Sequence, residues 1–201
     1  MCKTFTQTPI SRNNILYNRI HFKMTILGID PGTITTGFGI IKFEKNTITH
    51  IASGIISTPK VKELAPRLKV IYNDINDIIK EHKPDAFAIE TAFYGKNVQS
   101  AMKIGYARGV SLLAAVHNDL PVFEYSPREI KKSVVGNGAS SKEQVQFMIK
   151  KLMTLRSTKI KFDETDALAV AVCHAFRNSI ASHKSGSWKK FIEANPDRIV
   201  K

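Results

Sequence analysis

Cysteine is nearly absent from this chain, which contains only Cys2 and Cys173 among its 201 residues. Two cysteines so far apart, one of them inside an apolar helical run, exclude a disulfide framework and the ligand spacing of a zinc site. The chain also lacks any run of about 18 apolar residues, so no membrane-spanning segment is predicted. Together these absences predict a protein of a reducing, cytoplasmic compartment.

Acidic residues are also scarce, with 17 Asp and Glu against 30 Lys and Arg, which gives a net charge of +13. Such an excess favours a polyanionic partner such as nucleic acid, because a basic side chain placed on a phosphate releases condensed counterions. The length suits one domain with a full hydrophobic core, and a hydrophobic share of 43% excludes a disordered or fibrous chain.

The first 23 residues differ from the rest because they are basic and contain no Asp or Glu. They lack the continuous apolar segment of a secretory signal and only loosely resemble a transit peptide. We expect residues 1–23 to be a disordered basic extension, or to lie upstream of a true start at Met24. Residues 24–180 are predicted to form a single domain, and 181–201 a flexible basic tail.

From Met24 onward, hydrophobic periodicity predicts alternating strands and helices. Short apolar runs predict strands at 24–29, 37–43, 47–56, 86–89 and 122–125, and three- and four-residue spacings predict helices at 63–82, 98–117, 126 onward, 140–155 and 163–176. Three strands followed by alternating elements predict an α/β fold, with a mixed sheet and helices on its faces. The helix at 98–117 is rich in Ala, Gly and Leu. It should therefore pack closely, either inside the monomer or on a dimer surface.

Two acidic residues directly follow predicted buried strands. Asp30 lies in G-I-D-P-G-T and Glu90 in A-I-E-T-A-F. Strand ends are where open α/β sheets bind ligands, so we expect these two carboxylates to lie together. Either acid alone would also be typical of an ordinary turn.

Asp163 and Asp166 begin the last predicted helix, three residues apart and therefore on one face. One of them could simply cap the helix N-terminus. A cap does not explain why the following turns are almost wholly apolar, which indicates burial against the sheet. His174 lies about three turns beyond Asp163 and is predicted to be a core or edge histidine, not a ligand.

Four carboxylates without histidine or thiolate partners suit hard cations, Mg²⁺ or Mn²⁺. Two such ions ~3.5–4 Å apart can activate water on one side of a phosphate and stabilise the leaving oxygen on the other. Buried acids would repel one another unless cations lay among them. An acidic pocket in a basic chain thus predicts metal-dependent chemistry on a phosphodiester.

Four segments resemble, in order, the RuvC family of crossover (Holliday) junction endodeoxyribonucleases. They are G-I-D-P-G, I-E-x-x-F-x-x-K-N, a basic segment around V-V-G-N-G, and D-x-x-D-A-L-A-x-A, within about residues 24–177. The resemblance implies an RNase H-like fold with a five-stranded mixed sheet. It also implies a homodimer that nicks opposing strands of four-way junction DNA symmetrically, in recombination and repair, together with the RuvA and RuvB branch-migration proteins.

The resemblance assigns roles to individual residues. The family's metal-binding and catalytic acids fall on Asp30, Glu90, Asp163 and Asp166, which would hold two Mg²⁺ ions, with Mn²⁺ as a substitute.

DNA contacts are implied at three further positions. Phe93 matches an aromatic residue that engages an unpaired base at the crossover, a stacking contact of ~1–3 kcal/mol, although core packing would also account for it. Lys131 and Lys142 match the family's DNA-binding lysines. Charge and proximity in the sequence add Lys96, Arg108 and Lys132 as candidate phosphate contacts.

Three other interpretations stay open from the sequence. D-P-G-T-I-T-T-G also resembles the phosphate loop of actin-like and sugar-kinase ATPases, but those proteins need two such domains and about 180 residues provide one. An RNase H-like nuclease acting on RNA would use a similar acid set. A non-catalytic protein could bind branched DNA by charge and shape, although the intact acids disfavour it.

Overall fold

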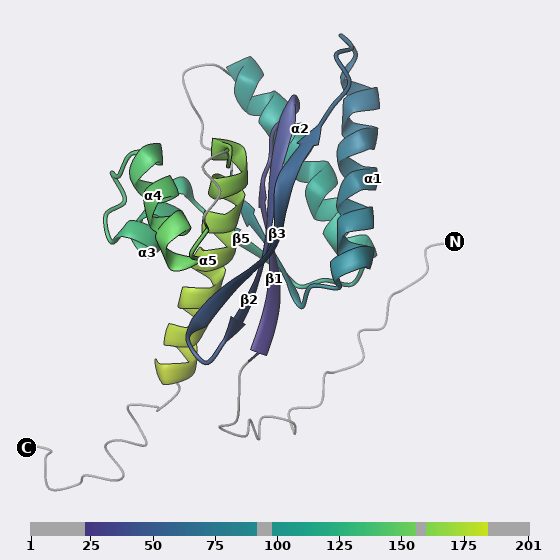
Figure 1. Cartoon of the computed structure of the whole chain (residues 1–201). Coiled ribbons are helices and arrows are strands. Elements are labelled where there is room, and N and C mark those ends of the chain that lie inside the picture. The colour runs from purple at the N-terminus through teal and green to yellow at the C-terminus, as the bar shows by residue number, and fades with distance from the viewer. Residues whose placement is uncertain (1–22, 92–97, 156–159, 185–201) are drawn as a thin grey trace, which may run out of the picture.

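The computed structural model describes residues 23–91, 98–155 and 160–184 (Figure 1). Three strands are followed by alternating elements and then by helices, in the order that the sequence predicts. The elements are β1 (Lys23–Asp30), β2 (Thr35–Glu44), β3 (Thr47–Ser57), α1 (Leu64–His82), β4 (Ala86–Glu90), α2 (Val98–His117), β5 (Val122–Tyr125), α3 (Pro127–Val135), α4 (Lys142–Leu152) and α5 (Phe162–Lys184).

The five strands form one mixed sheet in the order β3-β2-β1-β4-β5. β1, β2 and β3 pair as antiparallel neighbours, whereas β4 lies parallel to β1, and β5 lies parallel to β4. The C-terminal ends of β1, β4 and β5 therefore meet at one edge of the sheet. This edge brings together Asp30, Glu90 and Tyr125. The predicted mixed sheet is confirmed.

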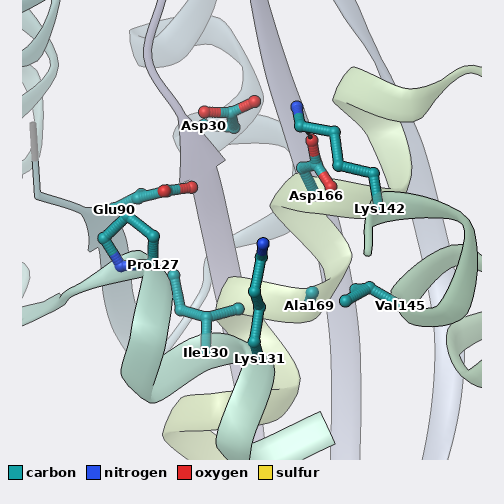
Figure 2. A pocket seen from close by; sticks show the side chains of 9 residues that line it. All are labelled: Asp30, Glu90, Pro127, Ile130, Lys131, Lys142, Val145, Asp166 and Ala169. Carbon is teal, nitrogen blue, oxygen red and sulfur yellow. Dashed lines mark hydrogen bonds and ion pairs between the residues drawn. The ribbon is translucent and has the colours of Figure 1, made fainter. Parts of the chain in front are cut away.

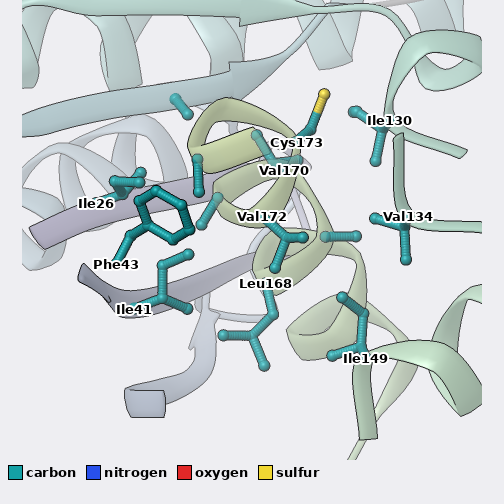
Figure 3. Close-up of a cluster of buried hydrophobic side chains, with 14 of the residues drawn as sticks. Ile26, Ile41, Phe43, Ile130, Val134, Ile149, Leu168, Val170, Val172 and Cys173 are labelled. Atoms are coloured by element: carbon teal, nitrogen blue, oxygen red, sulfur yellow. The ribbon is translucent and has the colours of Figure 1, made fainter. Parts of the chain in front are cut away.

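Helices cover both faces of the sheet (Figure 1). On one face α1 and α2 enclose a core that includes Leu27, Ile29, Phe87 and Ile89. On the other face α3, α4 and α5 enclose a second core, part of which Figure 3 shows. Its labelled members are Ile26, Ile41, Phe43, Ile130, Val134, Ile149, Leu168, Val170, Val172 and Cys173.

Side chains alternate between these two faces along each strand, because a strand has a two-residue period. In β1 the even-numbered Ile26 belongs to the α5 side, and in β4 Ala86 and Ala88 do so as well. Asp30 and Glu90 are the next even-numbered positions in their strands after Gly28 and Ala88. Their side chains are therefore directed to the same face, where α5 lies.

α5 packs on β1 and β2 without side chains between the two backbones. A Cβ atom on Gly28 would overlap the carbonyl oxygen of Ala167, and one on Gly37 would overlap that of Asp163. A Cβ atom on Gly39 would overlap the side chain and the backbone nitrogen of Leu168. These three glycines let the first turns of α5 lie directly over the sheet, at the end where Asp30 is located.

Local signals explain where the smaller helices begin. Ser126 and Glu129 form a capping box with Pro127 at the first position, as Ser126-Pro127 predicted. Ser141 forms a second capping box, so α4 begins at Lys142 instead of at the predicted Ser140. α4 also ends at Leu152, before the predicted Leu155.

The last helix is longer than the sequence pattern predicted. α5 was expected to end at Phe176, but it runs to Lys184 and includes the first residues of the predicted tail. No Gly or Pro follows Phe176 before Gly186, so nothing in this stretch of sequence stops the helix. Among the described residues, no helix has the length and apolar character needed to cross a membrane.

Gly28→Ala should lower the free energy of unfolding by about 3 kcal/mol, because the new Cβ meets helix backbone that cannot move aside. Gly54→Ala is a matched control, since its Cβ would meet the partly exposed ring of Phe38, which can shift. Chemical denaturation of both variants measures the difference. Equal, small losses would mean that α5 does not lie as closely on β1 as described.

Candidate metal centre

Three acidic side chains meet in one pocket at the edge of the sheet (Figure 2). Asp30 ends β1, Glu90 ends β4, and Asp166 lies in the second turn of α5. The pocket has a volume of about 180 Å³. Two lysines and a set of apolar side chains complete its wall: Lys131, Lys142, Pro127, Ile130, Val145 and Ala169.

The register of the central strands places the first two acids side by side. Ile29 is the parallel partner of Ile89, so the next residues of the two strands are Asp30 and Glu90. Asp166 joins them because α5 lies directly on the sheet. The structure thus brings together three acids that the sequence singled out in three separate segments.

Asp163, the fourth predicted acid, lies one turn earlier in α5. It is not part of the pocket wall, but its negative charge contributes to raising the pKa of Asp30. Its carbonyl oxygen lies against Gly37, so the start of the helix is held at the sheet edge.

The environment disfavours negative charge on the two strand acids. Burial raises the pKa of Asp30 from 3.8 to about 8, and the negative charges of Glu90, Asp166 and Asp163 contribute to this rise, against the opposing charge of Lys142. Burial, followed by repulsion from Asp166, raises the pKa of Glu90 to about 7. Without a bound cation, Asp30 therefore holds a proton at neutral pH.

Lys142 provides positive charge at this centre. Its Nζ lies 2.7 Å from Oδ2 of Asp166, whose side chain is only 14% exposed. The hydrogen bond to Asp166 raises the pKa of Lys142, so the lysine is charged. The sequence predicted Lys142 as a phosphate contact and gave no sign of this ion pair, which joins residues 24 positions apart.

The donors are suitable for a hard cation. All four acids offer only carboxylate oxygens, and the ammonium group of Lys142 stands in for a cation beside one of them. Within residues 23–91, 98–155 and 160–184, no three acidic, histidine or cysteine side chains surround a metal position as they stand. Cation binding would thus require the carboxylates to draw together and Lys142 to move.

The remaining predicted contacts lie in different places. Lys131 lines the pocket, whereas Lys132 lines a neighbouring groove formed by α3 and the α3–α4 loop. Arg108 is ion-paired with Glu124 of β5 and is not part of the pocket wall. Phe93 and Lys96 lie outside the described residues.

His174 is a core residue, as predicted. It is 2% exposed, and its Nδ1 lies 2.7 Å from the hydroxyl of Tyr125. Burial lowers the pKa of His174 to about 4, so the ring is neutral. The pair connects α5 to the end of β5.

This fold and site define an RNase H-like domain. Its acids lie at the ends of two central parallel strands and on the helix that packs over them. The family model described as "Crossover junction endodeoxyribonuclease RuvC" matches residues 26–174. The chain therefore belongs to the RuvC family, whose members are metal-dependent nucleases.

Individual relatives agree with this assignment. The RuvC protein of Cytophaga hutchinsonii is 43% identical over 174 residues, covering 87% of each chain. That of Geotalea uraniireducens is 50% identical over 152 residues, covering 76% of this chain and 88% of the relative. A structure of Thermus thermophilus RuvC in complex with a Holliday junction substrate has a TM-score of 0.73 at 28% identity, covering 79% of this chain and 96% of that chain.

Asp30→Asn should stabilise the metal-free protein at alkaline pH. The folded state holds the Asp30 proton up to about pH 8, whereas the unfolded chain loses it near 3.8. Between these values the folded state binds more protons, so its stability falls as pH rises. We expect the free energy of unfolding of the variant to exceed that of the wild type by on the order of a few kcal/mol above about pH 8, and by much less near pH 5.

Melting temperatures measured in EDTA across this pH range test the prediction. Asp119→Asn, which removes an exposed acid after α2 and outside the pocket, is the matched control. A constant difference between Asp30→Asn and wild type at every pH would show that the pKa of Asp30 is not raised.

Proposed function

We propose that this chain is a structure-selective endonuclease that resolves Holliday junctions by paired, symmetric nicks in DNA recombination and repair. The observation that carries the proposal is the pocket in which Asp30, Glu90 and Asp166 meet, on an RNase H-like sheet, in a chain of the RuvC family. A net charge of +13 suits a DNA substrate. The catalytic domain is assigned to residues 24–180, with basic segments at 1–23 and 181–201.

The proposed cofactor is a pair of Mg²⁺ ions, with Mn²⁺ as a substitute, held by Asp30, Glu90, Asp163 and Asp166. When bound, such ions would activate a water and stabilise the leaving oxygen of a phosphodiester. The family resemblance implies that cleavage would leave 5′-phosphate and 3′-hydroxyl ends. Their binding requires Asp30 and Glu90 to lose their protons, since burial favours the neutral acids. It would also require Lys142 to leave Asp166.

Once released, Lys142 can contact a phosphate oxygen at the mouth of the same pocket, because its side chain is 61% exposed. Lys131 projects into this pocket from α3 (Figure 2) and is placed for the same role. Lys132 would contact DNA farther along α3. Phe93 is proposed to engage an unpaired base at the crossover and Lys96 to contact a phosphate. Arg108 would contact a phosphate only after leaving Glu124.

A homodimer is supported by the outer face of α2. Val98, Met102, Tyr106, Leu113 and Val116 are exposed large hydrophobic residues at helical spacing. Gly105 and Gly109 lie among them, and a Cβ atom added to either glycine would have no neighbouring atom within 4 Å, so a second helix could approach closely. An unpaired apolar stripe of this kind marks an interaction surface. A dimer would provide the two active sites that paired nicks need.

Two further assignments complete the proposal. The protein is proposed to act with the RuvA and RuvB branch-migration proteins, which rests on the family resemblance alone. It is also proposed to act in the cytoplasm, which rests on its two widely separated cysteines.

A synthetic four-way junction, a linear duplex and an RNA–DNA hybrid, each with Mg²⁺ or EDTA, test the activity. We expect paired nicks in the junction alone, and no nicks in EDTA. Cleavage of the hybrid would instead identify a nuclease acting on RNA. Junction binding without cleavage in any divalent cation would identify a non-catalytic binder.

Asp30→Asn, Glu90→Gln, Asp163→Asn and Asp166→Asn should each reduce junction cleavage by about a hundredfold or more, since loss of one essential charged group typically has this effect. Junction binding should be kept or strengthened, because each change removes negative charge near a phosphate. Cleavage assays under single-turnover conditions and gel-shift binding measure the two effects.

Glu164→Gln is the matched control for these variants. Glu164 lies in the same turn of α5 as Asp163, but it accepts a hydrogen bond from Ser53 of β3 and is not part of the pocket wall. Its variant should cleave normally. If the four acid variants lost junction binding, or kept cleavage, the assigned roles would be wrong.

Leu113→Glu should dissociate the dimer, because it places a charge in the apolar stripe of α2. Ile51→Glu is the matched control, since Ile51 on β3 is 43% exposed and Leu113 is 47% exposed. Sedimentation velocity of both variants at micromolar concentration tests the assignment. A dimeric Leu113→Glu protein would exclude α2 as the interface, and a monomeric Ile51→Glu protein would place the interface elsewhere.

A further inference from the structure

A basic groove lies at the same end of the sheet as the acidic pocket, between the end of β3 and the start of α1. It has a volume of about 370 Å³ and is lined by Ile34, Thr58, Pro59, Lys60, Val61, Lys62 and Arg67. No acidic side chain forms its wall. Lys60 and Lys62 are exposed, and Arg67 is held in the wall by a hydrogen bond from its guanidinium group to the carbonyl oxygen of Val61. Glu63, next in the chain, is exposed and lies outside the wall.

Hydrogen bonds attach this groove to the loop that follows Asp30. The backbone N–H of Thr58 donates to the carbonyl oxygen of Ile34 over 3.1 Å, and the Thr58 hydroxyl donates to that of Thr33 over 2.9 Å. Ile34 is itself 69% exposed in the groove wall. It lies about four residues beyond Asp30, so their Cα atoms lie within about 14 Å of each other.

The groove and the two pocket lysines lie on opposite sides of the sheet. Lys131 and Lys142 come from α3 and α4, on the face that α5 covers, whereas the groove is built on α1, which covers the other face. Figure 1 shows the β3–α1 connection at the same end of the molecule as the end of β1. The acidic pocket is thus flanked by positive charge on both sides.

We propose that this groove binds backbone phosphates of the DNA arm that carries the cleaved strand. The inference rests on the proposed function, because it takes the acidic pocket as the position of the scissile phosphate. One strand of duplex DNA advances about 3.4 Å per nucleotide, so a span of ~14 Å places Ile34 in the groove wall within about four nucleotides of the cut. Lys60, Lys62 and Arg67 bind the phosphates, and Ile34 contacts the sugars between the groove and the pocket.

The test uses the full chain with Lys60→Ala and Lys62→Ala combined. Junction affinity should fall, and the slope of log K against log salt should decrease by about 1.8 for each bound protomer, because two phosphate contacts are lost. Single-turnover cleavage below saturating protein should fall in parallel with the affinity. The double variant Lys23→Ala/Lys80→Ala is the matched control, because it removes equal charge at the opposite end of β1 and α1.

Neutral methylphosphonate linkages locate the contact on the DNA. At one or two positions within about four nucleotides of the cut, a neutral linkage should weaken junction binding by the wild type. The same linkage should not weaken binding by the Lys60→Ala/Lys62→Ala variant. A wild-type salt slope in that variant, or the same slope change in the control variant, would overturn the proposal. These results are separate from the proposed function, which fails only if the wild-type protein does not cut the junction.

Discussion

The contact of α5 with the sheet is the constraint on which the rest of this structure depends. Gly28, Gly37 and Gly39 remove the side chains that would separate the helix backbone from β1 and β2. The helix therefore begins at the sheet edge where β1 and β4 end, and Asp166 reaches the pocket of Asp30 and Glu90. A conventional layer separation of ~10 Å would move the helix acid away from the strand acids. The site is thus a consequence of backbone packing as much as of acidic residues.

Electrostatics makes the same site unfavourable for a protein without cations. Burial and mutual repulsion raise the pKa of Asp30 to about 8 and of Glu90 to about 7. Lys142 offsets part of the negative charge through its ion pair with Asp166. A centre of this kind favours metal cations, which would replace both the protons and the lysine. The surrounding positive charge then remains available for the DNA backbone.

Much of the fold could be predicted because its signals are local. Apolar runs that end at Asp30 and Glu90 specified two buried strands, and Ser126-Pro127 specified the start of α3. The end of α5 was missed by eight residues, from Phe176 to Lys184, because a helix continues where no Gly or Pro stops it. The start of α4 was misplaced because Ser140 and Ser141 are both suitable caps, and only the hydrogen bond with Gln144 distinguishes them.

The sequence by itself determined the α/β class, the family and the candidate acids, since each depends on residue types at fixed spacing along the chain. Only the tertiary structure decided how those residues meet. The ion pairs of Lys142 with Asp166 and of Arg108 with Glu124, and the groove beside Ile34, join residues from separate elements. Such contacts depend on strand register and on how the helices pack on the sheet, and periodicity along one element does not contain either quantity.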